Sequence, residues 1–542
     1  MRRDAGRENQ DVVLKSGLIV DGTGGKPVVG NLLIRAGRIH RISARAIRTT
    51  GVVIDCSERV VAPGFIDAHS HLDWQLPIKG HDDQKYPLLA QGITTVIGGN
   101  CGWTPAGFRE GTRWREQVAD NPFSNGQLVL QWDTMEELVE RLRGSGASHN
   151  VALLAGHSSS RASIRGLDPS PLHPYEFKEL LRLLEIAMDQ GARGVSVGLQ
   201  LAPGLFARTE ELKEVALLVR RRGRVLAVRP RTVCAVAPGS SQKTFGQTSN
   251  IAALQELLDL ARQTGVRLQI SHLMFVGSRT WRTAETALRL IDRALSDGID
   301  VRFDICAVHA AVARVSAALS PWFLARGPAA FDDAEAMRTL RKEVSKAERQ
   351  LGVSSVDIRI TDTGIQDLAE YNGKTLSEIA RLRRLSPSDA LIELARRSGG
   401  RARLLCQKIG NDKLLADLIR HRACLFMTGA TAERPGAENP AAFGALARVL
   451  EVSREQKLLP VEEVVRRMTG AIAERFDIRD RGLLKEGLAA DIVVFDWQNV
   501  RDNSGSIDGN RSPEAIDYVF VNGRKIIGAG KKESPLNAGI PI

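Results

Sequence analysis

Short apolar runs alternate with amphipathic stretches through most of this chain. Eight such runs are separated by segments whose apolar residues recur at helical spacing, which is typical of successive βα units. Eight units predict an α/β fold of the (β/α)8 TIM-barrel type. The predicted strands are residues 64–67, 94–97, 151–155, 194–197, 224–228, 266–270, 300–303 and 423–427.

The two ends of the chain have a different pattern, with short β-type runs broken by Gly and Asp. Examples are DVVLKSGLIVDGTG near the N-terminus and IDYVFVNGRKIIGAG near the C-terminus. Two β segments at opposite ends of a chain most simply pair with each other. Residues 1–63 and 480–542 are therefore predicted to form one small β-sandwich domain, beside a barrel domain of residues 64–479.

About 120 residues separate the seventh predicted strand from the eighth, and they contain helix-type segments at 332–347 and 386–397. Ser386 and Pro387 suit the cap and first turn of the second helix. Loops of this length rarely remain unstructured in a compact domain. The pattern therefore predicts an inserted lobe at about residues 310–420.

Composition narrows the class of protein. Hydrophobic residues make up 43% and charged residues 25%, as in ordinary globular proteins. No apolar run approaches the ~18 residues of a membrane span, and the opening MRRDAGRENQD lacks the apolar stretch of a secretory signal. We therefore expect a cytoplasmic protein with no membrane partner, and the sequence leaves its oligomeric state open.

The net charge of +12 raises the question of a polyanionic partner, but the basic residues are spread along the chain. A nucleic-acid footprint should be concentrated, so no nucleic-acid partner is expected. The six cysteines show no paired spacing such as C-x-x-C, which argues against a disulfide framework or a structural zinc knuckle.

Candidate ligands for a metal ion follow three predicted strands. The first strand runs into His69-Ser70-His71, the second into Cys101 and the sixth into His272. His69 and His71 are two residues apart on an extended segment, so their side chains point the same way. Imidazole and thiolate are standard zinc ligands, and barrel active sites lie at these strand ends. The pattern predicts a metal site of His69, His71, Cys101 and His272.

A lone histidine at a strand end is more often a hydrogen-bonded structural residue than a ligand. We apply this interpretation to His157, His309 and His421. Four further histidines lie in expected loops or at element ends, where we expect them to face solvent: His40, His81, His149 and His173.

Several segments carry a resemblance to a known family. VVAPGFIDAHSHLD (60–73) resembles the metal-binding opening of the amidohydrolase superfamily, and QGITTVIGGNCG (91–102) is similar to the segment that supplies a cysteine ligand in its N-acyl-D-amino-acid deacylase (D-aminoacylase) branch. The resemblance continues in order to MTGAIAERFDIRDRGLLKEGLAADIVVFD. It implies a metal-bearing barrel, a composite β-sandwich, an inserted lobe before the last strand, and amide hydrolysis by metal-activated water. His69, His71, Cys101 and His272 match ligands of that family.

Two positions depart from the family pattern. A metal-ligating histidine after the fifth strand is Arg229 here, and the aspartate that serves as ligand and general base after the eighth strand is Thr428. A guanidinium about 4 Å from a divalent ion is repelled by up to ~8 kcal/mol at an effective dielectric of about 20. We therefore expect one zinc ion per chain rather than two. Arg229 is expected to pair with the Cys101 thiolate or with an anionic substrate group.

The catalytic base is left unassigned by these replacements. Thr428 cannot replace a carboxylate, and losing a general base typically costs ~10²- to 10⁴-fold in rate. Asp73 lies nearby in the sequence, although a structural role is the favoured interpretation for it.

The substrate side departs from the family too. The Lys and Tyr that hold the carboxylate of an acyl-D-amino acid are Met274 and Cys306 here, and we assign Arg229, Arg231 and Met274 to substrate binding. The prediction is a zinc-dependent hydrolase of a C–N amide bond in a small molecule of altered specificity, with an anionic substrate as one option. The alternative is a catalytically degenerate barrel that holds an anion or serves as an interaction scaffold.

Overall fold

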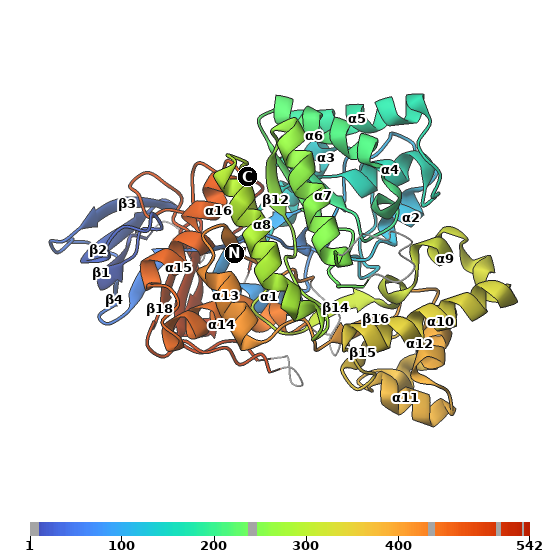
Figure 1. Ribbon diagram of the computed structural model, residues 1–542. Helices are drawn as coiled ribbons and strands as arrows, with labels where there is room; N and C mark the ends of the chain where they lie inside the picture. The colour runs from blue at the N-terminus through green and yellow to red at the C-terminus, as the bar shows by residue number, and fades with distance from the viewer. Residues whose placement is uncertain (1–9, 237–246, 432–438, 506–510, 534–535) are drawn as a thin grey trace.

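The computed structural model describes residues 10–236, 247–431, 439–505, 511–533 and 536–542 (Figure 1). Its centre is a barrel of parallel strands, paired in the orders β6-β7-β8 and β9-β10-β11-β12-β13-β17. The backbone N–H of Ala68 donates to the carbonyl of Phe426 at 3.2 Å and joins the first strand to the last. All eight predicted strands are confirmed: β6 (Phe65–Asp67), β7 (Ile93–Gly98), β8 with β9 (Asn150–Leu153 and Ala155–Gly156), β10 (Gly194–Gly198), β11 (Val225–Arg229), β12 (Arg267–Ile270), β13 (Val301–Ile305) and β17 (Cys424–Phe426).

Helices cover the outside of the barrel, which is why its strands are apolar on both faces. In α8, for example, Ala287, Ile291 and Ala294 recur at helical spacing and are buried, while the opposite face is polar. The barrel helices are α1 (Asp82–Ala90), α2 (Arg115–Ala119), α3 (Met135–Ser145), α4 (His157–Arg165), α5 (Pro174–Asp189), α6 (Thr209–Arg221), α7 (Ser249–Thr264), α8 (Ala284–Ser296), α13 (Asp412–Arg420), α14 (Ala441–Glu455), α15 (Val461–Met468) and α16 (Gly470–Arg475), with 3-10 turns at Leu72–Trp74, Gly204–Phe206 and Thr280–Thr283.

The two ends of the chain share one nine-stranded sheet, seen in blue and red beside the barrel in Figure 1. Antiparallel pairing of β5 with β18 joins them, and one buried cluster includes Leu14, Leu32, Ile492 and Phe520 from both ends. The strands are β1 (Val12–Ile19), β2 (Val28–Arg35), β3 (Arg38–Ser43), β4 (Val52–Asp55), β5 (Val60–Pro63), β18 (Ile492–Phe495), β19 (Ile516–Val521), β20 (Arg524–Gly528) and β21 (Lys531–Lys532).

The chain between β13 and β17 forms a lobe at one side of the barrel, drawn in yellow in Figure 1. A buried cluster that includes Val315, Phe323, Leu340 and Leu391 lies at its centre. Ser386 caps α12 as predicted, since its hydroxyl accepts from the N–H of Asp389. The lobe elements are β14 (Ala311–Arg314), α9 (Pro321–Ala325), α10 (Ala334–Leu351), β15 (Ile358–Asp362), α11 (Leu376–Arg383), α12 (Pro387–Arg397) and β16 (Arg403–Cys406), with 3-10 turns at Val315–Ala318, Pro328–Asp332 and Gln366–Tyr371.

Within the described residues, no helix combines the length and the apolar character that crossing a membrane requires.

A buried ion pair ties the terminal sheet to the barrel. Arg481 donates to Asp491 at 2.6 Å, and their side chains are 1% and 2% exposed. Asp491 also accepts from Asn150 at the start of β8 and from the N–H of Asn522. The carboxylate therefore links the C-terminal segment, which follows the barrel in sequence, to a barrel strand.

We expect Asp491→Ala to destabilise the protein by about 3 kcal/mol, because it leaves the buried Arg481 charge with only the half-exposed Asp480 as a carboxylate partner. The readout is the melting temperature followed by circular dichroism. Arg35→Ala is the control, since it breaks an exposed pair with Asp11 and should have little effect. Equal melting temperatures for the two variants would contradict this account of the interface.

Candidate metal centre

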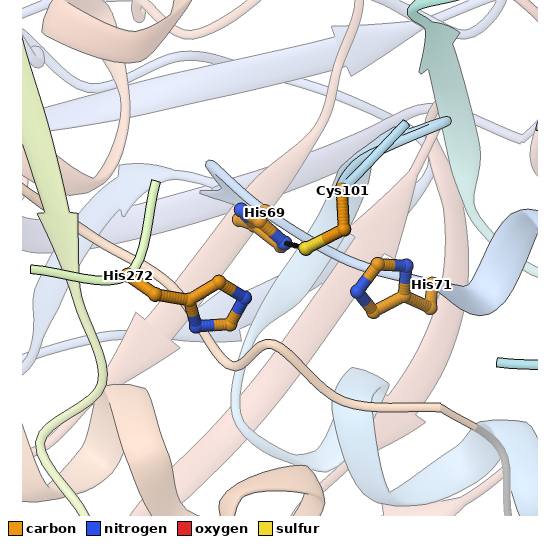
Figure 2. A group of neighbouring side chains, drawn as sticks. All are labelled: His69, His71, Cys101 and His272. Atoms are coloured by element: carbon orange, nitrogen blue, oxygen red, sulfur yellow. Dashed lines mark hydrogen bonds between the residues drawn. The ribbon is translucent and has the colours of Figure 1, made fainter. Parts of the chain in front are cut away.

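Four ligand-type side chains meet at the C-terminal ends of the barrel strands. His69 and His71 follow β6, Cys101 follows β7 and His272 follows β12. All four are buried, and one ligand atom from each lies within 4.8 Å of the others. Figure 2 shows the four side chains pointing toward one another. The fold thus brings together the complete set of residues that the sequence predicts as ligands.

The backbone is strained at two of these residues. Cys101 has φ 52° and His272 has φ 55°, in the left-handed region that non-glycine residues rarely adopt. Such conformations cost of order 1–3 kcal/mol each and persist only where the surroundings enforce them. The N–H of His272 donates to Asp304 at 2.8 Å, and the N–H of Gly102 donates to Ser196 at 2.9 Å. These bonds hold the turns that direct the thiol and the imidazole inward.

Several nitrogens of the cluster are buried without a hydrogen-bond partner among the described residues. They are both ring nitrogens of His71, both of His272, and Nδ1 of His69. The remaining nitrogen, Nε2 of His69, lies 3.3 Å from the sulfur of Cys101. A buried polar atom without a partner costs ~1–3 kcal/mol and is rare in native proteins. The residues therefore fit a metal ion, which would provide the missing partner.

Burial also sets the protonation of the cluster. It lowers the pKa of His69, His71 and His272 well below the usual value, and the nearby Arg229 charge lowers it further. The neutral imidazoles are thus available to a metal ion. Burial raises the pKa of the Cys101 thiol to about 11, against the opposing effect of Arg229. The thiol must therefore lose a proton when a metal binds it.

Two carboxyl groups that the sequence analysis missed support the cluster. Asp304 lies 3.7 Å from Nδ1 of His69 and accepts from Gln269 at 2.9 Å. Asp67 accepts from the N–H of His69 at 3.1 Å and from the N–H and hydroxyl of Thr428. Metal-binding histidines usually have such carboxylates behind them. The signal was present, because each aspartate interrupts an apolar strand at its C-terminal end.

Burial raises the pKa of Asp67 and of Asp304 to about 7 each. Asp73 is also fully buried, with a pKa raised to about 8 by burial. Its side chain packs against Gly98, and it is not among the described residues that line the cavity beside the cluster. Asp73 therefore does not face the cavity, and its structural role stays a prediction.

Arg229 lies directly beside the cluster, at the end of β11. Its Nη1 is 3.8 Å from the sulfur of Cys101, and its Nε donates to Gln200 at 3.0 Å. Arg231 is held differently: its Nε donates to both oxygens of Glu256, at 3.0 and 2.9 Å, and its Nη atoms donate to backbone carbonyls of Leu205 and Ala207. Arg229 is therefore the one of the two predicted substrate-binding arginines that reaches the cluster.

A cavity of about 320 Å³ opens beside the cluster, a size typical of small-molecule sites. Its walls include His71, His272, Arg229, Met274 and Thr428 at the barrel end, and apolar side chains of the inserted lobe elsewhere. Two of the four cluster residues, His71 and His272, thus line a space large enough for a substrate.

The histidines outside the cluster mostly follow the sequence prediction. His157, His309 and His421 contact Glu211, Asp412 and Asp292 at 2.8, 3.0 and 3.2 Å. His40, His81 and His173 are exposed.

The prediction for His149 was wrong, because this residue is fully buried. The C-terminal segment near Gly539 packs over its backbone, and such a long-range contact has no local sequence signal.

Comparison with known proteins gives the same architecture. The N-acyl-D-glutamate deacylase of Alcaligenes xylosoxydans xylosoxydans is 29% identical over 532 residues, 95% of this chain and 93% of that protein. The N-acyl-D-aspartate deacylase of the same organism is 27% identical over 531 residues, 95% of this chain and 92% of that protein. The N-acyl-D-glutamate deacylase of Bordetella bronchiseptica, solved with zinc and a phosphonate inhibitor, is 26% identical with a TM-score of 0.79, covering 98% of this chain and 99% of that one.

The family model described as "Amidohydrolase family" matches residues 52–527, which includes the barrel, the lobe and every residue of the cluster. The match spans far more than half of the chain. The chain belongs to the amidohydrolase family, as a divergent relative of the D-aminoacylases.

Proposed function

We propose that this protein hydrolyses a C–N amide bond of a small molecule with the help of one zinc ion held by His69, His71, Cys101 and His272. The observation that carries the proposal is the convergence of these four buried side chains, among which both ring nitrogens of His71 and of His272 lack partners among the described residues. The position of His71 and His272 at the wall of a cavity and the similarity to a deacylase solved with zinc support it. Imidazole and thiolate together favour zinc over magnesium or calcium.

One ion per chain follows from the charge of Arg229. Its guanidinium lies 3.8 Å from the Cys101 sulfur, where the family has a metal-ligating histidine. A second divalent ion there would be strongly repelled. A solved D-aminoacylase, 26% identical with a TM-score of 0.78, is described by one-metal activation and second-metal attenuation of its binuclear centre. A one-metal site is therefore compatible with amide hydrolysis in this fold.

When bound, the zinc ion supplies activation of water and polarisation of the amide carbonyl. Arg229 stabilises the Cys101 thiolate beside it, because the guanidinium compensates the negative charge in a buried site. The base that the resemblance implies is missing, but Thr428 lines the cavity, and its hydroxyl donates to the Asp67 carboxylate while accepting from the N–H of Ala430. A proton taken by the Thr428 oxygen from the cavity can pass to Asp67 as the hydroxyl gives up its own proton. We assign the acceptor role to this pair.

The second candidate function is a non-catalytic anion-binding or interaction scaffold. It is favoured by the two replaced positions, Arg229 and Thr428, which remove a ligand and a base of the family. In that case an anion would bind at Arg229 rather than at Arg231, whose donors are taken by Glu256 and backbone carbonyls. An anionic substrate group would bind at the same place in the enzyme.

The metal content of the purified protein tests the proposed ligands. We expect about one zinc ion per chain in the purified protein by elemental analysis, and a loss of most of it in His69→Ala. His40→Ala is the control, because His40 is exposed and distant in sequence from the cluster. Two ions per chain, or none after growth with added zinc, would overturn the proposed site.

The proton path is tested at Thr428, which is not a proposed ligand. Thr428→Val removes the hydroxyl at nearly constant volume, so kcat should fall by ~10²-fold or more on any amide that the protein hydrolyses. Thr428→Ser keeps the hydroxyl and should retain most of the activity. Zinc content should be unchanged in both. A Val variant as active as the Ser variant would remove Thr428 from the mechanism, and a zinc-loaded protein that hydrolyses no amide would favour the scaffold.

A further inference from the structure

The cavity beside the cluster continues from the barrel into the inserted lobe. At the cluster end its walls include His71, His272 and Thr428. The lobe supplies apolar side chains from its turns and helices, which include Leu319, Leu324, Val344, Leu391 and Leu404. The cluster end is therefore the reacting end, and the rest of the cavity offers mostly apolar contact, with Glu348 and Ser388 among its polar lining residues.

The polar groups along the cavity walls offer little to bind a charged part of the substrate away from the reacting end. The two positions at which the family binds an amino-acid carboxylate, Met274 and Cys306, both line the cavity and carry no charge. Arg231 is paired with Glu256, and Arg314 donates to Asp120 at 3.0 Å and to the carbonyl of Asn121 at 2.6 Å. These two guanidiniums are occupied by the protein itself.

We propose that the cavity binds an extended apolar acyl chain, so that the substrate is an amide of a medium-length or long carboxylic acid. The carbonyl would lie at the His71, His272 and Thr428 end and the chain would run along the lobe. This inference rests on the proposed function, because it identifies the substrate class of the same site.

An apolar chain is expected to bind because the contact removes apolar surface of both the acyl chain and the cavity wall from water. Each buried methylene group should improve the dissociation constant about fourfold until the cavity is full. A carboxylate in the same apolar space would lose its hydration without a free cation to replace it. The lobe therefore selects for chain length and against charge on the chain.

The test is a binding series of linear primary amides from acetamide to decanamide, measured by calorimetry on the zinc-loaded protein. We expect affinity to rise about fourfold per methylene over at least part of the series. A matched series of N-acylglycines adds a carboxylate at the head and should keep the same dependence on chain length. Affinity that does not change with chain length would overturn the proposal.

Two alanines at the lobe wall allow the cavity to be filled. Ala317 and Ala313 both line it and are exposed, so Ala317→Trp and Ala313→Phe are not expected to disturb the lobe core. Each should weaken decanamide binding by more than about 10-fold and leave acetamide binding unchanged. Ala334→Trp is the matched control, since Ala334 is an exposed alanine of the same lobe outside the described cavity wall. Equal effects of the cavity variants and the control would refute the assignment.

Failure of the proposed function would be distinguishable from failure of this inference. Binding and hydrolysis are separate readouts, so a length-dependent affinity in a protein that hydrolyses none of the amides would retain the acyl site and reject the hydrolase. Hydrolysis of short amides without length-dependent binding would retain the hydrolase and reject the acyl site.

Discussion

The electrostatic constraint at the end of the barrel controls the rest of the site. Three neutral imidazoles, one thiol and the Arg229 guanidinium share a region shielded from water, together with the carboxyl groups of Asp67 and Asp304. Charges in such a place are stable only when they compensate one another. A second divalent ion near Arg229 would place two positive charges close together, which is the basis of the proposed one-metal site. In that site the Cys101 thiolate would compensate part of the charge of the ion and of Arg229, whose Nη1 lies 3.8 Å from the sulfur.

The proposed one-metal site also accounts for Thr428, at the position where the sequence resemblance implies an aspartate. In the proposed one-metal site, a third carboxylate beside Asp67 and Asp304 would add negative charge without a second ion to balance it. The hydroxyl of Thr428 instead satisfies Asp67 by donating to it, as an ionised aspartate could not. Under the proposal, Arg229 and Thr428 therefore belong to one charge balance.

Much of the fold could be predicted from the sequence because its signals are local. The apolar runs of the barrel strands and the Ser386-Pro387 helix start depend on neighbouring residues only. The His69, His71, Cys101 and His272 ligands could be predicted because barrel topology brings strand ends together. The contacts of Arg231 with Glu256 and the burial of His149 depend on distant segments, so they required the structure. Asp304 and Asp67 were within reach of the sequence, since a carboxylate inside an apolar strand needs a partner.

The inserted lobe connects the charge balance to substrate selection. Because Arg229 lies against the Cys101 sulfur, a substrate carboxylate at this place would compete with the thiolate for the guanidinium. Under the proposal, Met274 and Cys306 supply no charged anchor, and the lobe offers apolar surface instead. The substrate then gains binding energy from contacts along its acyl chain, far from the reacting carbonyl. These contacts can position the amide without disturbing the charges around the metal. Under the proposal, the absence of a charged carboxylate anchor and the apolar surface of the lobe both fit a site that contains Arg229.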